Sequence, residues 1–243
     1  MQDYLIVIPA RYQSSRLPGK PLLDLMGKSM ILRTYEKCLE VVPKEKVIVA
    51  TDDVRIYNHC LSHSVITLMT SVSCLTGTDR VAEVAQIIKA EYYINVQGDE
   101  PLFNSKDILK VLKSIKSNKG EIINGYCSIN NSEDFFSTSI PKVVFRPDGR
   151  LLYMSRSPIP GNKKGDFLKG KRQVCIYGFP HEALEKFRLK KNKATLEKEE
   201  DIEILRFLEM GFDVFMIELS SDSLAVDNPK DVQKVLNRLR NEN

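Results

Sequence analysis

The stretch of the chain with the most evident chemistry runs from residue 8 to residue 22 and reads IPARYQSSRLPGKPL. Arg11 and Arg16 can present planar guanidinium groups to phosphate oxygens, and Lys20 adds a more mobile positive charge. The stretch lies between an apolar run and an expected helix, so its backbone N–H groups can also face an anion. Three neighbouring cations repel one another unless an anion such as a triphosphate lies among them. An ordinary basic surface loop is the alternative, and the spacing matches neither a Walker A loop nor GxGxxG.

Two aspartates are candidates for binding a divalent cation. Asp99, in VQGDEP, follows an apolar run, and Asp227, in AVDNPKD, precedes an expected helix. Mg²⁺ typically binds through one or two carboxylates together with phosphate oxygens and water. If the fold brings the two segments together, Asp99 and Asp227 could hold the ion between them. The alternative is that each segment only caps the helix that follows it.

Two further motifs could contact the rest of a substrate. TGTDR, at residues 76–80, places small hydroxyl residues and a glycine at an expected helix start, where a base or ribose could approach closely. A capped helix with Asp79 near the positive end of its dipole is the alternative. Arg156, in LYMSRSPIP, could pair with a substrate carboxylate, or it could be a surface arginine at a strand end. The three histidines, His59, His63 and His181, have no evident catalytic partner.

Composition excludes several classes of protein. With 36 basic and 32 acidic side chains, the formal net charge of +4 is too small to indicate nucleic acid binding. The five cysteines include no CxxC pair, so neither a zinc site nor a disulfide framework is indicated, and we expect reduced thiols in a cytoplasmic protein. We find no signal peptide and no apolar stretch long enough to span a membrane, so no membrane partner is expected.

The first hundred residues alternate between two patterns. Short apolar runs, typical of buried strands, occupy residues 4–8, 47–50, 65–68 and 92–96. Between them lie helix-like segments at 30–41 and 81–88. This alternation predicts a parallel sheet, and ligands bind beyond the carboxyl ends of such strands.

The middle of the chain has a different pattern. Strand-like runs lie at 122–129, 142–145, 151–155 and 173–179, and Asp148-Gly149 is a turn signal between two of them. They predict an antiparallel excursion that contacts substrate or another subunit. Beyond it we expect one helix over 197–210, a strand over 214–219 and a final helix over 228–241.

Seven motifs occur in the order found in the CMP-Kdo synthetases, also called 3-deoxy-manno-octulosonate cytidylyltransferases. They are IPARYQSSRLPGKPL, VIVATDD, TGTDRVAEV, INVQGDEPL, LYMSRSPIP, CIYGF and AVDNPKDV. The resemblance runs from Ile6 to about Val235. It implies an α/β, Rossmann-like nucleotidyltransferase fold with a mixed, mainly parallel sheet. The single domain would cover residues 1–243 and carry a small antiparallel dimerisation insertion at about 122–180.

The resemblance also implies an activity. The expected reaction is Mg²⁺-dependent transfer of CMP from CTP to the anomeric hydroxyl of a 3-deoxy-2-keto sugar acid, with Kdo as the expected sugar and pyrophosphate as the leaving group. We expect a homodimer whose partners are CTP and the sugar acid.

The family's site residues map onto this chain in three groups. The triphosphate and base side consists of Ala10, Arg11, Ser14, Arg16, Lys20, Thr78 and Arg80. The metal aspartates are Asp99 and Asp227, which with Arg11 and Lys20 form the expected catalytic set. The sugar side consists of Gln97, Arg156, Gln173, Tyr177, Glu200 and Glu203. Lys142 also matches a family lysine, but the resemblance implies no role for it.

Three positions depart from the family pattern. Family members commonly carry histidine where this chain has Cys74 and Gln173, and glycine where it has Cys175. Gln173 retains hydrogen-bonding capacity but cannot become cationic. A related sugar acid, such as an amino-Kdo or a nonulosonate, is therefore an alternative substrate, and a non-catalytic nucleotide-binding protein is an alternative class. A dehydrogenase is disfavoured because the first strand–loop–helix lacks the glycine fingerprint.

Overall fold

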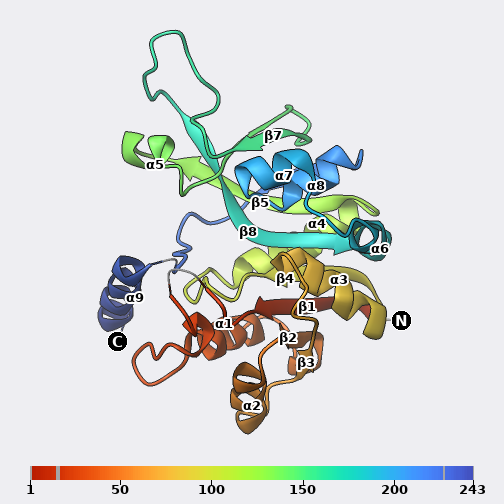
Figure 1. The fold of residues 1–243 in the computed structure, drawn as a ribbon. Helices are drawn as coiled ribbons and strands as arrows, with labels where there is room; N and C mark the ends of the chain where they lie inside the picture. The colour runs from red at the N-terminus through yellow and green to blue at the C-terminus, as the bar shows by residue number, and fades with distance from the viewer. Residues whose placement is uncertain (1, 15–16, 227, 243) are drawn as a thin grey trace.

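Nine strands form one mixed sheet in the computed structural model, which describes residues 2–14, 17–226 and 228–242 (Figure 1). They are β1 (Gln2–Ala10), β2 (Val47–Thr51), β3 (Thr67–Met69), β4 (Ala90–Val96), β5 (Ile122–Ile129), β6 (Lys142–Phe145), β7 (Leu151–Ser155), β8 (Gly170–Pro180) and β9 (Val214–Glu218). Seven follow the order β3-β2-β1-β4-β8-β5-β9, within which only β8 runs antiparallel to its neighbours. The expected mixed, mainly parallel sheet is confirmed.

Helices cover both faces of this sheet, because successive side chains of a strand point to opposite faces and both sets are apolar here. In β1, Val7 packs in the cluster formed with α3 (Gly77–Ile87), α6 (His181–Leu189) and α8 (Ile204–Glu209). Ile6 and Ile8 pack in the opposite cluster with α1 (Met30–Leu39), α2 (Val54–Ser62) and α4 (Lys106–Ser117). This two-sided burial produces the layered architecture visible in Figure 1.

The last helix, α9 (Pro229–Glu242), packs through a smaller apolar cluster. Its Val235 and Leu239 meet Met30 at the start of α1 and Leu102 beyond β4. The cluster holds the C-terminal segment against the region that follows β4, as Figure 1 shows for the blue helix near α1. Within the described ranges, no helix is both long and apolar enough to cross a membrane.

The middle of the chain extends beyond the main sheet. Residues 131–169 include α5 (Ser132–Phe136), the β6–β7 ribbon and a long loop before β8, all at the top of Figure 1. The predicted turn at Asp148-Gly149 is confirmed, and Gly149 has a φ of 90°, which favours glycine. The flanking strands β5 and β8 are members of the main sheet.

Two expected elements differ from the structure. The single helix expected over 197–210 is two short helices, α7 (Thr195–Glu200) and α8, because Asp201 adopts a left-handed conformation with a φ of 49°. Lys193 stabilises that break through an ion pair with Asp201 Oδ1 at 2.6 Å. The third strand, expected over 65–68, lies at Thr67–Met69.

Candidate active site

The basic loop meets Asp99 at the carboxyl end of β4. Lys20 Nζ donates hydrogen bonds to Asp99 Oδ2 at 2.8 Å and to the carbonyl oxygen of Val226 at 2.7 Å. The backbone N–H of Val226 donates to the carbonyl oxygen of Asp99 at 2.9 Å. Three segments far apart in the sequence therefore meet at one point, where a lysine, a carboxylate and backbone groups converge.

The shape of the basic loop follows from its turn residues. The N–H of Gly19 donates to the carbonyl oxygen of Tyr12 at 2.9 Å and closes the loop. Gly19 has a φ of 71°, and a Cβ there would lie 3.0 Å from the Tyr12 ring, so both conformation and space favour glycine. Immediately after it, a 3₁₀ turn (Lys20–Leu22) begins and turns Lys20 towards Asp99.

Three other predicted residues of this loop are among the described residues. Ala10 is buried at the end of β1, Arg11 is exposed and Ser14 is half-buried. Arg16 and Asp227 lie outside the described residues, so the convergence of Asp99 with Asp227 stays a prediction. The capping alternative for Asp99 is wrong, because its carboxylate pairs with Lys20, and it is Asn104 that accepts from the N–H of Lys106 at the start of α4.

The predicted base-binding motif starts α3 with a capping box. Thr76 Oγ1 accepts from the Asp79 N–H at 3.2 Å, and Asp79 Oδ2 accepts from the Thr76 N–H at 2.8 Å. Arg80, one residue further, is 3% exposed and donates to Asp52 Oδ2 at 2.9 Å and to Thr70 Oγ1. Asp52 directly follows β2 and Thr70 directly follows β3, so Arg80 is held at the carboxyl ends of these two strands.

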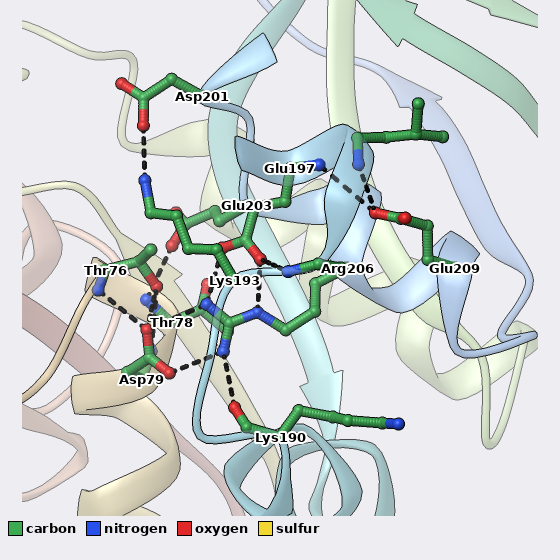
Figure 2. A network of polar contacts seen from close by, with 12 residues as sticks. Thr76, Thr78, Asp79, Lys190, Lys193, Glu197, Asp201, Glu203, Arg206 and Glu209 are labelled. Atoms are coloured by element: carbon green, nitrogen blue, oxygen red, sulfur yellow. Dashed lines mark hydrogen bonds and ion pairs between the residues drawn. The ribbon is translucent and has the colours of Figure 1, made fainter. Parts of the chain in front are cut away.

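Glu203, predicted for the sugar side, contacts this motif directly (Figure 2). Its carboxylate accepts from the backbone N–H of Thr78 at 2.8 Å and from Gln97 Nε2 at 2.9 Å. A Cβ on Gly77 would lie 3.2 Å from the Gln97 amide, so the glycine lets the start of α3 approach Gln97 closely. Burial raises the pKa of Glu203.

Glu200 and Arg156 meet at the C-terminal end of α7. The Glu200 carboxylate accepts from Ser155 Oγ at 2.6 Å, from the Arg156 N–H at 2.8 Å and from the Tyr153 hydroxyl at 3.3 Å. Burial alone would raise the pKa of Glu200, but these hydrogen bonds outweigh that effect and lower the pKa. The Arg156 guanidinium donates to the carbonyl oxygens of Glu200, Asp201 and Thr138. Arg156 therefore fixes the end of α7 in addition to any contact it makes with a substrate.

Lys142 has a role that the sequence did not reveal. It is fully buried, and its Nζ donates to the carbonyl oxygens of Ser137 and Ile140, both at 2.7 Å, and of Arg156 at 2.5 Å. Burial lowers the pKa of Lys142. The lysine ties the segment after α5 to the residue that holds the end of α7.

Gln173, Cys175 and Tyr177 occupy every second position of β8; Gln173 and Tyr177 are buried and Cys175 is half-buried. Gln173 Nε2 donates to Asn124 Oδ1 at 3.0 Å, so its amide bonds within the sheet. Tyr177 pairs across strands with Asn95, whose amide atoms are both buried without a hydrogen-bond partner among the described residues. Burial raises the pKa of Cys175 and of Tyr177. Among the described residues, the side chain of Gln173 therefore bonds Asn124 and neither Glu200 nor Glu203.

No activated thiol is found among the described residues. Burial and a hydrogen bond to Glu83 raise the pKa of Cys74 to about 12, and burial raises that of Cys60 to about 11. His59 bonds to Ser29 Oγ at 2.7 Å, within a structural contact at the start of α1. The chemistry this edge can support is charge stabilisation and positioning.

Two residues that hold residues of a predicted site motif in place, Asp52 and Arg206, were not themselves predicted from the sequence. Asp52, which holds Arg80, directly follows the apolar run 47–50 and Thr51, and Asp99 was selected on a similar signal. Arg206, in α8, is fully buried and bonds both Asp79 and Glu197. No local signal marked Arg206, because both of its partners are brought to it by the fold.

The comparisons with known proteins agree with this geometry. A family described as cytidylyltransferase matches residues 5–218. The chain is 38% identical over 237 residues to the 3-deoxy-manno-octulosonate cytidylyltransferase of Chlamydia pneumoniae, covering 94% of this chain and 91% of that protein. It is 35% identical over 235 residues to the Escherichia coli enzyme of the same name, covering 97% and 95%. The solved structure of CMP:2-keto-3-deoxy-manno-octonic acid synthetase complexed with CTP matches with a TM-score of 0.91 at 34% identity over 100% of both chains.

The mixed sheet, the basic loop after β1 and the polar carboxyl edge define a nucleotidyltransferase fold. Within that class, the match at 35–38% identity over most of the chain is specific. The chain belongs to the 3-deoxy-manno-octulosonate cytidylyltransferase family, and it is an enzyme of the cytidylyltransferase kind.

Proposed function

We propose that the protein transfers CMP from CTP to the anomeric hydroxyl of a 3-deoxy-2-keto sugar acid, with Kdo as the first substrate to test. The observation that carries the proposal is the meeting of Lys20 with Asp99 and Val226 at the carboxyl edge of the sheet. The names of the relatives, and the CTP complex of the solved neighbour, support the same reaction.

In the proposed reaction, a bond forms between the anomeric oxygen and the α-phosphorus of CTP. The bond from that phosphorus to the oxygen bridging it to the β-phosphorus breaks, the hydroxyl loses its proton, and pyrophosphate leaves. Negative charge accumulates on the phosphate oxygens, so positioning and electrostatic stabilisation supply most of the catalysis. Arg11 and Lys20 would offset that charge, with Ala10, Ser14 and Arg16 completing the loop around the triphosphate.

The base and the sugar would bind on either side of Glu203. Thr78 and Arg80 lie on the base side, where Asp52 fixes the Arg80 guanidinium. Gln97, Glu200 and Glu203 lie on the sugar side, where hydroxyl groups can donate to the two carboxylates. Arg156, Gln173 and Tyr177 complete the expected sugar side.

The donor chemistry fits Mg²⁺. Mg²⁺ typically takes one or two carboxylates together with phosphate oxygens and water, and the Asp99 carboxylate lies beside Lys20 of the basic loop. Asp99, and Asp227 as a prediction, would hold it. When bound, the ion would neutralise phosphate charge.

A coupled pyrophosphate assay tests the proposal directly. We expect release from CTP, and not from ATP, GTP or UTP, only when a sugar acid and Mg²⁺ are both present. The sugar panel should contain Kdo, 8-amino-Kdo and a nonulosonate, because Gln173 and Cys175 change the family pattern on the sugar side. Absence of release with every sugar acid, despite CTP binding by calorimetry, would favour the non-catalytic alternative. We also expect a cytoplasmic homodimer.

A further inference from the structure

Arg206 occupies the centre of a buried ionic cluster (Figure 2). Its side chain is 0% exposed, and Nε and Nη2 each donate to a carboxylate oxygen of Glu197 at 2.6 Å. Nη1 donates to Asp79 Oδ1 at 2.8 Å, and Nη2 reaches Asp79 Oδ2 at 3.3 Å. One guanidinium thus binds two carboxylates that are far apart in the chain.

Each carboxylate belongs to a different part of the site. Asp79 closes the capping box of α3, from which Thr78 and Arg80 face the base side. Glu197 lies in α7, which ends at Glu200, and Arg206 itself lies in α8, which follows Glu203. We call Thr78 and Arg80 the nucleotide half, and Glu200 and Glu203 the sugar half.

Besides the Arg206 cluster, Glu203 forms a second connection between α3 and α8. Glu203 bonds the Thr78 N–H and Gln97, so the start of α3 and the start of α8 touch directly as well as through Arg206. Figure 2 shows Thr76, Thr78 and Asp79 on one side of the cluster, with Glu197 and Glu203 on the other. The two halves are therefore joined by charged and directional contacts.

Stability alone is a poor account of this cluster. A buried ion pair often stabilises a fold no more than well-packed apolar residues of similar size, because both charges lose their hydration. A guanidinium held by two bidentate carboxylates does, however, fix the relative orientation of the elements that carry them. Apolar contacts alone would leave α7 and α8 freer to shift against α3.

We propose, resting on the proposed function, that Arg206 is a positioning residue that couples the nucleotide half to the sugar half. A nucleotide that contacts Thr78 and Arg80 holds α3 in one position, and the Asp79–Arg206–Glu197 cluster fixes α7 and α8, with Glu200 and Glu203, relative to it. Coupling of this kind is reciprocal, so each ligand raises the affinity for the other by the same factor.

The test measures that factor directly. The dissociation constant of Kdo is determined by calorimetry with Mg²⁺ in the absence and presence of α,β-methylene-CTP, which cannot release pyrophosphate. We expect a ratio of at least about 5 for the wild-type chain, the lower end of typical coupling. If Kdo binding is detected only when the nucleotide analogue is present, the coupling ratio is larger than the calorimeter can measure, and this outcome also supports the inference.

Two variants and one control complete the design. Arg206→Lys keeps the charge but removes the bidentate geometry, and Glu197→Gln keeps the size but removes one charge. In both, we expect the ratio to fall to within about twofold of one, with at least about a tenfold loss of kcat/KM for Kdo. Arg150→Lys is the matched control, because Arg150 also bridges two acids, Glu121 at 3.2 Å and Asp213 at 3.1 Å, at the other end of the sheet.

All measurements are made on protein shown to be folded by circular dichroism, well below its melting temperature. A lower melting temperature with an unchanged ratio would make Arg206 purely structural and overturn the inference, as would a wild-type ratio of one. If Arg206→Lys does not fold, Glu197→Gln decides between these outcomes. Absence of pyrophosphate release by the wild-type chain is a separate result, and it would count against the proposed function.

Discussion

At the residue scale, Asp99 is held at both its side chain and its backbone carbonyl group. It pairs with Lys20 at 2.8 Å, while Val226 holds its backbone carbonyl. A carboxylate held this way keeps a fixed position beside Lys20. The pairing also means that a bound triphosphate would compete with Asp99 for Lys20, leaving the carboxylate to a metal ion.

Replacing Asp99 with asparagine should therefore lower kcat by at least about 100-fold, because the metal contribution to charge stabilisation amounts to several kcal/mol. Steady-state pyrophosphate release at saturating CTP, Kdo and Mg²⁺ measures the effect. Asp3→Asn is the control, since Asp3 also pairs with a lysine, Lys46, but at the other end of β1. Unchanged turnover in Asp99→Asn would remove its metal role.

Single residues also mark the limit of prediction from sequence. Asp99 was found because it follows a buried apolar run, and Lys20 because three cations lie close together in the chain. Lys142 was noticed only through resemblance, since three carbonyl groups surround it after folding. Arg206 was missed because an arginine beside Leu205 and Phe207 looks like the polar face of a helix until its partners are known.

At the scale of elements, the break between α7 and α8 positions Glu200 and Glu203, the carboxylates of the proposed sugar side. Sequence periodicity favoured one helix, because Ile202, Leu205 and Met210 continue a helical spacing across the break. Periodicity cannot reveal the left-handed conformation of Asp201, which depends on Lys193 and on the contacts of Glu200 and Glu203. Strands β1, β2 and β4 and helices α1 and α3 were predicted near their observed bounds because each buries an apolar pattern of its own. Helix α2 was not predicted, and β3, which is only partly buried, lies two residues later than its start was expected.

Glu200 links α7 to β7, so its charge should stabilise the fold in a pH-dependent way. Its folded-state pKa is lowered, so its contribution is fully present above the ordinary value of 4.5 and is lost as the pH falls through the lowered value. Glu200→Gln should reduce the free energy of unfolding by about 1–2 kcal/mol at pH 7. The difference from wild type should shrink below about pH 4.5.

Urea unfolding of both proteins between pH 3 and pH 8 measures this difference. Glu199→Gln is the matched control, because Glu199 is the exposed neighbour of Glu200 on the same helix. A difference that stays constant over the whole pH range would show that the Glu200 charge is not what joins α7 to β7.

At the scale of the whole molecule, the antiparallel strand β8 divides the sheet between two tasks. Parallel strands β1, β2 and β4 bring the basic loop, Asp52 and Asp99 to one edge. The chain between β5 and β8 adds α5, the β6–β7 ribbon, whose β6 pairs with β8, and a long projecting loop (Figure 1). The sequence indicated this division through its turn signal and short strands, but it could not show that β5 and β8 belong to the main sheet.

That extension carries large apolar side chains on its surface, with Phe136 47%, Leu152 59% and Leu168 75% exposed. These side chains lie on α5, β7 and the loop before β8, and exposed apolar side chains on one projecting segment are candidates for a surface that another subunit covers. We expect light scattering to give the mass of two chains, and the double variant Leu152→Glu/Leu168→Glu to raise the dimer dissociation constant at least about 30-fold. Leu189→Glu, at a side chain 69% exposed on α6, should leave it unchanged. A wild-type monomer, or a double variant that dimerises as well as the control, would exclude this extension as the dimer interface, since two buried charges cannot be accommodated there without loss of affinity.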